Sequence, residues 1–145
     1  MVSKLKIAFL LTIVLTFFKV NYFVAQSFSI VGNNIGFTKT STQTIKSVFK
    51  GKYSLWSNKE SVTLVLPSTK SSNAGAVAKY LYGTTVNGMQ KYWLSMVFQG
   101  RANPPIFLET DDEIITYVSK NSGAIGIVSS TNKNIPTTIK ITISD

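Results

Sequence analysis

The alternation of hydrophobic and polar positions after residue 26 predicts several short strands. Residues 27–31 (SFSIV) alternate weakly and stop at a Gly-Asn-Asn turn, which indicates a first strand. Residues 61–66 (SVTLVL) and 123–128 (GAIGIV) are almost continuously apolar, as is typical of buried strands, and Pro67 is expected to end the first of them. Residues 137–143 (TTIKITI) alternate strictly, which predicts a half-exposed final strand.

Helical spacing of apolar residues appears in four other segments. Residues 40–42 (TST) can cap a helix that places Ile45, Val48 and Phe49 on one side and ends at Gly51. Helices are also predicted over 74–82, ended by Gly83, and over 86–98, ended by Gly100. In the latter, the expected core stripe consists of Met89, Trp93, Met96 and Val97.

A last helix is predicted to begin in the acidic segment 109–112 and to end at Ser122-Gly123. Its acidic residues (Glu109, Asp111, Asp112 and Glu113) could be paired catalytic carboxylates or ligands of a hard metal ion, but their position is explained by the positive end of the helix dipole. The predicted order is β-α-β-α-α-α-β-β. Because strands and helices alternate, we expect an α/β fold, a three-layer sandwich with a mixed sheet flanked by helices.

Residues 1–26 form a separate segment. Lys4 and Lys6 precede an apolar run over residues 7–18, and Lys19 ends it. The run is shorter than the roughly 20 residues that a spanning helix needs, so we expect a signal peptide, cleaved after Gln26, and no stable membrane span thereafter. An uncleaved N-terminal anchor is the alternative. The expected organisation is therefore a signal peptide over 1–26 and one α/β domain over 27–145, with the protein periplasmic or secreted.

The amino-acid composition excludes several kinds of catalytic and metal site. The 145 residues include no Cys and no His, which removes thiol nucleophiles, imidazole bases and the usual zinc sites, so we expect neither an enzyme nor a cofactor. The formal charge is +9; without Lys4, Lys6 and Lys19 it is +6, which favours anionic partners. The segment 46–53 interleaves lysines with aromatic residues, but an exported chain seldom meets nucleic acid, and we expect a solvated basic face.

The candidate binding site is the polar loop between the strand at 61–66 and the helix at 74–82. Its residues are Ser68, Thr69, Lys70, Ser71, Ser72 and Asn73. The loop follows the carboxyl end of a buried strand, where open α/β sheets place ligands, and it leads into a helix N-terminus whose free N–H groups attract anions. Helix capping alone is the other interpretation of these residues.

Three sequence blocks resemble phosphate-binding substrate-binding proteins of ABC transporters. They are VFKGKYSLW (48–56), the tryptophan helix YW…VFQGR…PP (92–105) and GAIGIV (123–128). Their order and spacing are similar to those of short, single-lobe members of this family, which also have a signal peptide. The resemblance implies one lobe of a type II periplasmic binding protein fold, in an exported protein that binds phosphate or another small anion.

The resemblance also bears on the site. In full-length members an arginine on the strand and a Ser-Gly-Thr loop hold phosphate between two lobes. The matching loop here is Ser71-Ser72-Asn73, where only Ser71 is identical; the arginine is missing, and Lys70 is the available cation. The departures leave two functions open. One is binding of a small anion, such as phosphate, and the other is a structural or protein-interaction domain, homodimeric or with a protein partner, that has lost the ligand.

Overall fold

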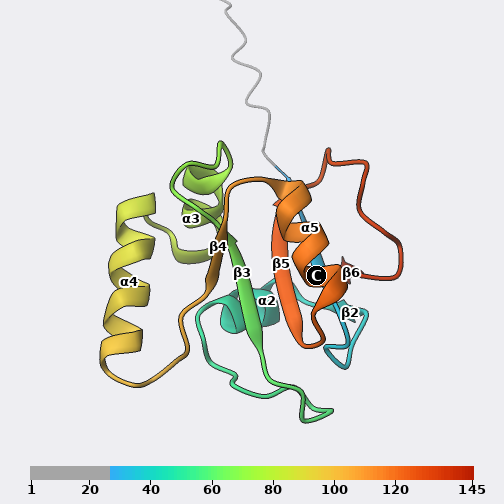
Figure 1. Cartoon of the computed structure of the whole chain (residues 1–145), viewed down its shortest axis with the longest axis horizontal. Helices are drawn as coiled ribbons and strands as arrows, with labels where there is room; N and C mark the ends of the chain where they lie inside the picture. The colour runs from blue at the N-terminus through green and yellow to red at the C-terminus, as the bar shows by residue number, and fades with distance from the viewer. Residues whose placement is uncertain (1–26) are drawn as a thin grey trace, which may run out of the picture.

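The computed structural model describes residues 27–145, so the expected signal peptide lies outside the described residues. Six strands form one mixed sheet in the order β2-β6-β1-β5-β3-β4 (Figure 1). The strands are β1 (Phe28–Gly32), β2 (Lys39–Thr40), β3 (Thr63–Pro67), β4 (Ile106–Leu108), β5 (Ala124–Ser129) and β6 (Lys140–Ile143). The helices are α2 (Thr42–Phe49), α3 (Ala74–Tyr82), α4 (Val86–Phe98) and α5 (Asp111–Lys120).

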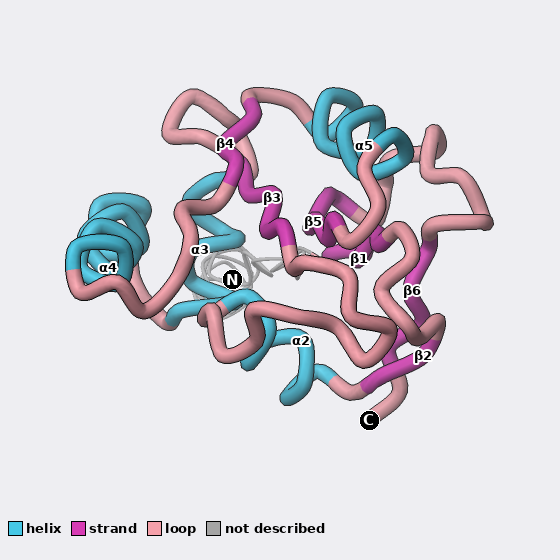
Figure 2. The backbone as a smooth tube through the Cα atoms, turned by 60° about the horizontal axis from the view of Figure 1, so that its bottom comes forward, coloured by secondary structure: helices cyan, strands magenta, loops and turns pink. Residues whose placement is uncertain are grey.

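The sheet separates two hydrophobic cores, which confirms the predicted three-layer α/β arrangement. On one face, α2, α3 and α4 pack on a cluster that includes Phe49, Leu66 and Ile127. On the other face, α5 is the one helix of residues 27–145 that packs on a smaller cluster around Val65 and Ile114. Figure 2 shows α5 on the opposite side of the sheet from α2 and α3.

Strand directions determine where the loops meet. β3 pairs in parallel with both β4 and β5, whereas β1 runs antiparallel to β5 and β6. The carboxyl ends of β3, β4 and β5 therefore lie at one edge of the sheet. The loop after Pro67 and the start of α5 meet there, at the position where α/β sheets commonly bind ligands.

The predicted elements are largely confirmed, with three corrections. Strands β2 and β4 were not predicted, because two or three residues show no measurable period. The strand ends at Pro67 as expected, but Pro67 is itself the last residue of β3 rather than the residue after it. It is tolerated because β5 pairs only with Thr63–Val65, so at Pro67 only β4 lies alongside. Val97 is not core: it is 36% exposed, whereas Trp93 is 3% exposed.

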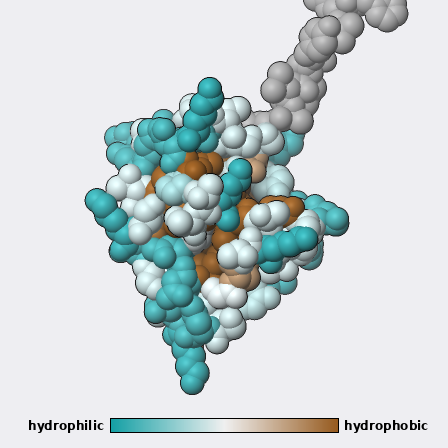
Figure 3. Space-filling model, turned by 90° about the vertical axis from the view of Figure 1, so that its right-hand side faces the viewer, coloured by the Kyte–Doolittle hydropathy of each residue, from teal (hydrophilic) through white to brown (hydrophobic). Residues whose placement is uncertain are grey.

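Among residues 27–145, the longest helix is α4 with 13 residues, and none of the helices there could span a bilayer. On the face shown in Figure 3, hydrophilic side chains project around smaller areas of apolar surface.

Candidate functional site

The loop that the sequence singled out lies at the carboxyl edge of β3, as predicted. The backbone N–H of Ser68 donates to the Leu108 carbonyl at 2.7 Å, which fastens the start of the loop to β4. Ser68, Ser71 and Asn73 are half-buried, while Thr69, Lys70 and Ser72 are exposed. The structure therefore brings all six predicted residues to one accessible edge of the sheet.

Much of the loop's hydrogen-bonding capacity is used within the loop. The Ser71 N–H donates to the Ser68 carbonyl at 3.0 Å, and the Lys70 N–H donates to the Ser68 hydroxyl at 3.3 Å. The Asn73 N–H donates to the Ser71 hydroxyl at 3.3 Å, and the Ala74 N–H donates to the Ser71 carbonyl at 3.2 Å. These hydrogen bonds fix the conformation of the turn, and three of the four involve Ser71.

The first turn of α3 keeps two open donors. Asn73 occupies the N-cap position, but its side chain makes no capping hydrogen bond, because its backbone is helical rather than extended. Within the described chain, the N–H groups of Gly75 and Ala76 have no acceptor. The space beside Gly75 is empty, since a Cβ built there would meet nothing within 4 Å. An anion can therefore reach these donors at the positive end of the helix dipole.

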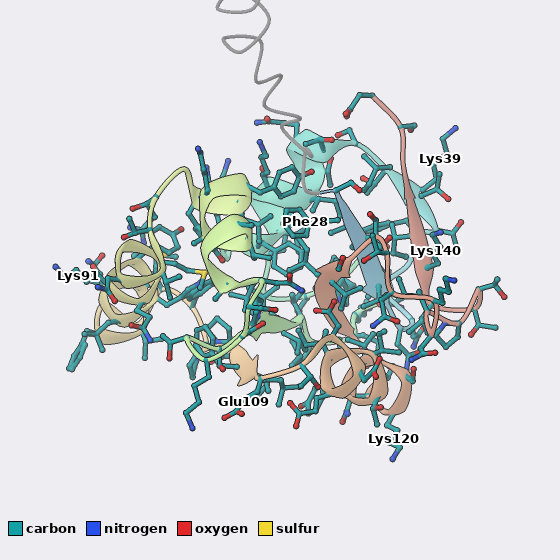
Figure 4. The ribbon with its side chains drawn as sticks, turned by 90° about the horizontal axis from the view of Figure 1, so that it is seen from above. Phe28, Lys39, Lys91, Glu109, Lys120 and Lys140 are labelled. Carbon is teal, nitrogen blue, oxygen red and sulfur yellow. The ribbon has the colours of Figure 1, made fainter. Side chains whose placement is uncertain are left out.

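Two carboxylates lie beside the loop, and sequence reasoning did not place them there. Asp111 accepts from the Asn73 amide nitrogen at 3.0 Å through one oxygen and from the Ser129 backbone N–H at 2.9 Å through the other. Glu109 lies 3.2 Å from the Lys70 ammonium, in an exposed ion pair. Figure 4 shows Glu109 at the outer surface of the molecule. The loop therefore combines open amide donors with nearby negative charge.

The acidic segment serves as the start of a helix, in agreement with the interpretation from the sequence. Thr110 caps α5 through the Glu113 N–H at 3.1 Å, and the Glu113 carboxylate accepts from the Thr110 N–H at 3.1 Å, a capping box. Hydrogen bonds from the amides of Asn132 and Asn134 lower the pKa of Asp112. Residues 27–145 contain no group of three or more acidic side chains arranged to hold a metal ion.

A buried polar contact joins the helices beneath the sheet. The Tyr82 hydroxyl donates to the Phe49 carbonyl at 2.6 Å and accepts from the Trp93 indole N–H at 2.9 Å. Burial raises the pKa of Tyr82 far above its usual range. This contact fixes the end of α2 and the middle of α4 against α3 without contributing a reactive group.

Comparisons with known proteins support the fold. No protein-family model matches the chain, and no curated protein matches it. Among solved structures, the chain is similar to PstS from Borrelia burgdorferi, with a TM-score of 0.56, 10% identity and 83% of this chain covered. It is also similar to a phosphate ABC transporter substrate-binding protein with bound phosphate from Clostridium perfringens, with a TM-score of 0.53, 13% identity and 82% covered.

A third similar structure is an ABC-type phosphate transport receptor from Vibrio cholerae, with a TM-score of 0.50, 14% identity and 83% of this chain covered. The chain spans 44–48% of the length of these three proteins. The described residues thus have the fold of one half of these transport proteins, a mixed α/β sheet flanked by helices.

Proposed function

We propose that this chain is an exported, non-enzymatic binding lobe that takes a small oxyanion, phosphate foremost, at the N-terminus of α3. The observation that carries the proposal is the pair of open N–H donors of Gly75 and Ala76, at the end of a loop in which Thr69 and Ser72 are exposed. The fold shared with phosphate receptors supports it. Lys70 adds a mobile cation, because an exposed pair such as Lys70–Glu109 contributes at most about 1 kcal/mol.

Asp111 determines which anion the site prefers. A carboxylate only accepts hydrogen bonds, so a ligand that approaches it must bring a proton. Phosphate keeps a proton at neutral pH and sulfate does not, so we propose a preference for phosphate. A single lobe also leaves one side of the ligand in water, and we expect binding in the millimolar range.

The test is a titration of the ¹⁵N-labelled 27–145 chain with phosphate and, separately, sulfate at constant ionic strength. Phosphate is expected to shift the amide signals of Ser72, Gly75 and Ala76 in a saturable way, and sulfate is expected to do so less. The Asp111→Asn variant should bind both anions more tightly, with the larger gain for sulfate. Asp112→Asn is the matched control, because it removes the same charge from the neighbouring position, where the side chain bonds Asn132 and Asn134 instead.

The second candidate function is a structural or protein-interaction domain that keeps the lobe and has lost the ligand. The observation in its favour is the use of the loop's own N–H groups within the turn, together with the carboxylates of Glu109 and Asp111. If neither the wild type nor Asp111→Asn shows saturable shifts in 20 mM phosphate, anion binding at this loop is refuted and the interaction function remains.

A further inference from the structure

A second hollow lies at the opposite edge of the sheet, where β3 begins and α4 ends. Its volume is about 140 Å³, and Trp93 and Gly51 form part of its wall. Its polar lining residues include Ser54, Ser61, Thr63, Arg101 and Asn103. In the part of the chain that the structure describes, none of the five makes a side-chain hydrogen bond or an ion pair.

The charge of this hollow is positive. No carboxylate lines it, and Arg101 contributes a guanidinium group. The acidic residue nearest in sequence, Glu60, is directed to the Asn34 amide at 3.4 Å. A guanidinium group that forms no ion pair favours a carboxylate or phosphate group, which it can bind with two parallel hydrogen bonds.

An apolar groove of about 280 Å³ adjoins the polar hollow. Trp93 and Pro104 line both, so the two hollows lie side by side. The groove is formed mainly by Leu94, Val97, Pro105 and Phe107, with Gln90 as its polar member. Leu94 is 60% exposed and Phe107 is 38% exposed, so this side of α4 leaves apolar area in water that a ligand can cover.

The wall between the two hollows is held in place by the fold. Gly51 has φ +75°, and a Cβ there would lie 3.0 Å from the Trp93 ring, so the chain approaches this ring closely. The Tyr92 hydroxyl donates to the Lys50 carbonyl at 2.7 Å, and the Arg101 N–H donates to the Met96 carbonyl at 3.0 Å. The hollow therefore exists before any ligand arrives, which lowers the entropic cost of binding.

We propose that this surface binds a free amphipathic anion, an acidic headgroup on a short unbranched apolar chain. The headgroup pairs with Arg101 and the amide of Asn103, and the chain lies along Leu94 and Phe107. The charge complementarity argues for this ligand class, since a neutral apolar molecule would leave the guanidinium and hydroxyl donors unused. The two hollows together reach the lower end of the size range of small-molecule sites, about 300 Å³. The proposal is independent of anion binding at α3.

The test is a titration of the 27–145 chain with octanoate and decanoate below their aggregation concentrations, monitored by amide shifts. Acetate lacks the apolar chain and octanol lacks the charge. Both are therefore expected to bind at least tenfold more weakly than octanoate. Since each buried CH₂ contributes about 0.8 kcal/mol, each added carbon should strengthen binding up to about fourfold. Shifts are expected in residues 101–103 together with Leu94 and Val97.

Two variants measure separately what the charged part and the apolar part of the site contribute to binding. Arg101→Gln should weaken decanoate at least tenfold and leave octanol unchanged, and Leu94→Ser should weaken both. Leu94 is mostly exposed, so this change leaves the core intact. Lys91→Gln is the matched control for Arg101→Gln, because Lys91 projects from α4 outside both hollows (Figure 4) and its loss should have no effect.

Four results would overturn the proposal. Equal affinities for octanoate and octanol would show that the surface binds apolar chains without recognising the charge. An Arg101→Gln variant that binds decanoate like the wild type would show the same. Absence of saturable shifts at millimolar decanoate would show that no site exists. Flotation of the protein with phosphatidylglycerol vesicles, without binding of free decanoate, would show a membrane contact instead of a site for a free acid.

Discussion

Gly123 joins three strands, and its replacement by alanine tests how closely they approach. Its N–H donates to the Asn33 carbonyl at 2.8 Å, beyond the end of β1. Its carbonyl accepts from the Thr63 N–H at 3.1 Å, at the start of β3, and from the buried Trp56 indole N–H at 2.8 Å. Its φ is +80°, and a Cβ at this position would overlap the carbonyl oxygen of Ser61.

The expected cost of Gly123→Ala has two parts. A left-handed backbone costs about 1–2 kcal/mol for a residue with a Cβ. The overlap is with backbone rather than with a flexible side chain, so the start of β3 must move, and the bonds from Thr63 and Trp56 are strained or lost. Each buried bond left unsatisfied costs about 1–3 kcal/mol. If both bonds are lost, we therefore expect a total loss of about 3–8 kcal/mol in the free energy of unfolding.

Gly83→Ala is the matched control. Gly83 also has a positive φ, +66°, but a Cβ there would meet nothing within 4 Å, so only the backbone part of about 1–2 kcal/mol applies. Urea denaturation of the 27–145 chain, followed by circular dichroism, measures both losses. In thermal melts, 1 kcal/mol corresponds to about 4 °C for a domain of this size. If Gly123→Ala costs no more than Gly83→Ala, the close contact with Ser61 is not part of the folded protein.

Two further predictions concern stability. Tyr82→Phe should lower the free energy of unfolding by about 2 kcal/mol, because the Trp93 indole N–H and the Phe49 carbonyl lose their partner in the core. Tyr92→Phe removes an exposed hydrogen bond to the Lys50 carbonyl and should cost less than half as much in the same urea titration. Equal losses for the two variants would contradict the argument. Hydrogen bonds lower the pKa values of Asp112 and Asp145 below those of the unfolded chain, so the two carboxylates stabilise the fold above about pH 4 and lose this effect as the pH falls further. Thermal melts from pH 6 to pH 2 should show the loss, and Asp112→Asn should make it smaller. If the melting temperature of Asp112→Asn falls with pH as steeply as that of the wild type, Asp112 has no such role.

The sequence was sufficient for the helices that local signals delimit. Helices α3 and α4 have the predicted bounds, because Gly83 ends one in a left-handed conformation and Gly100 follows the other with φ +63°. Val97 shows the limit of periodicity. It is eight residues from Met89 and thus lies about 80° around the helix from it, at the border of the buried stripe. Whether a border position is covered depends on the neighbouring elements, and here those among residues 27–145 leave Val97 36% exposed.

The sequence was less informative about the candidate site, because the site is assembled from distant parts of the chain. The loop itself was predicted from its hydroxyls and from the strand before it. Asp111 is 38 residues from Asn73, and only the parallel pairing of β3 with β4 and β5 brings the two together. Arg101 follows a helix-ending glycine and precedes Pro104-Pro105, and these neighbours predict only that the helix ends there. Its place in the hollow follows from the residues of β3 and of the segment 51–54 that line the hollow with it.

The two proposed sites differ most in the charge around them, and this difference allows one titration to examine both. Four of the six acidic residues lie at 109–113, beside the loop at α3, whereas no acidic residue lines the hollow around Arg101. A multiply charged anion without a proton is therefore repelled from the first site and attracted to the second. In a titration, sulfate should shift the amide signals of residues 101–103 at a lower concentration than those of residues 72–76. With phosphate, the difference between the two concentrations should be smaller. The reverse order for sulfate would mean that the open amides of Gly75 and Ala76 outweigh the charge of Asp111.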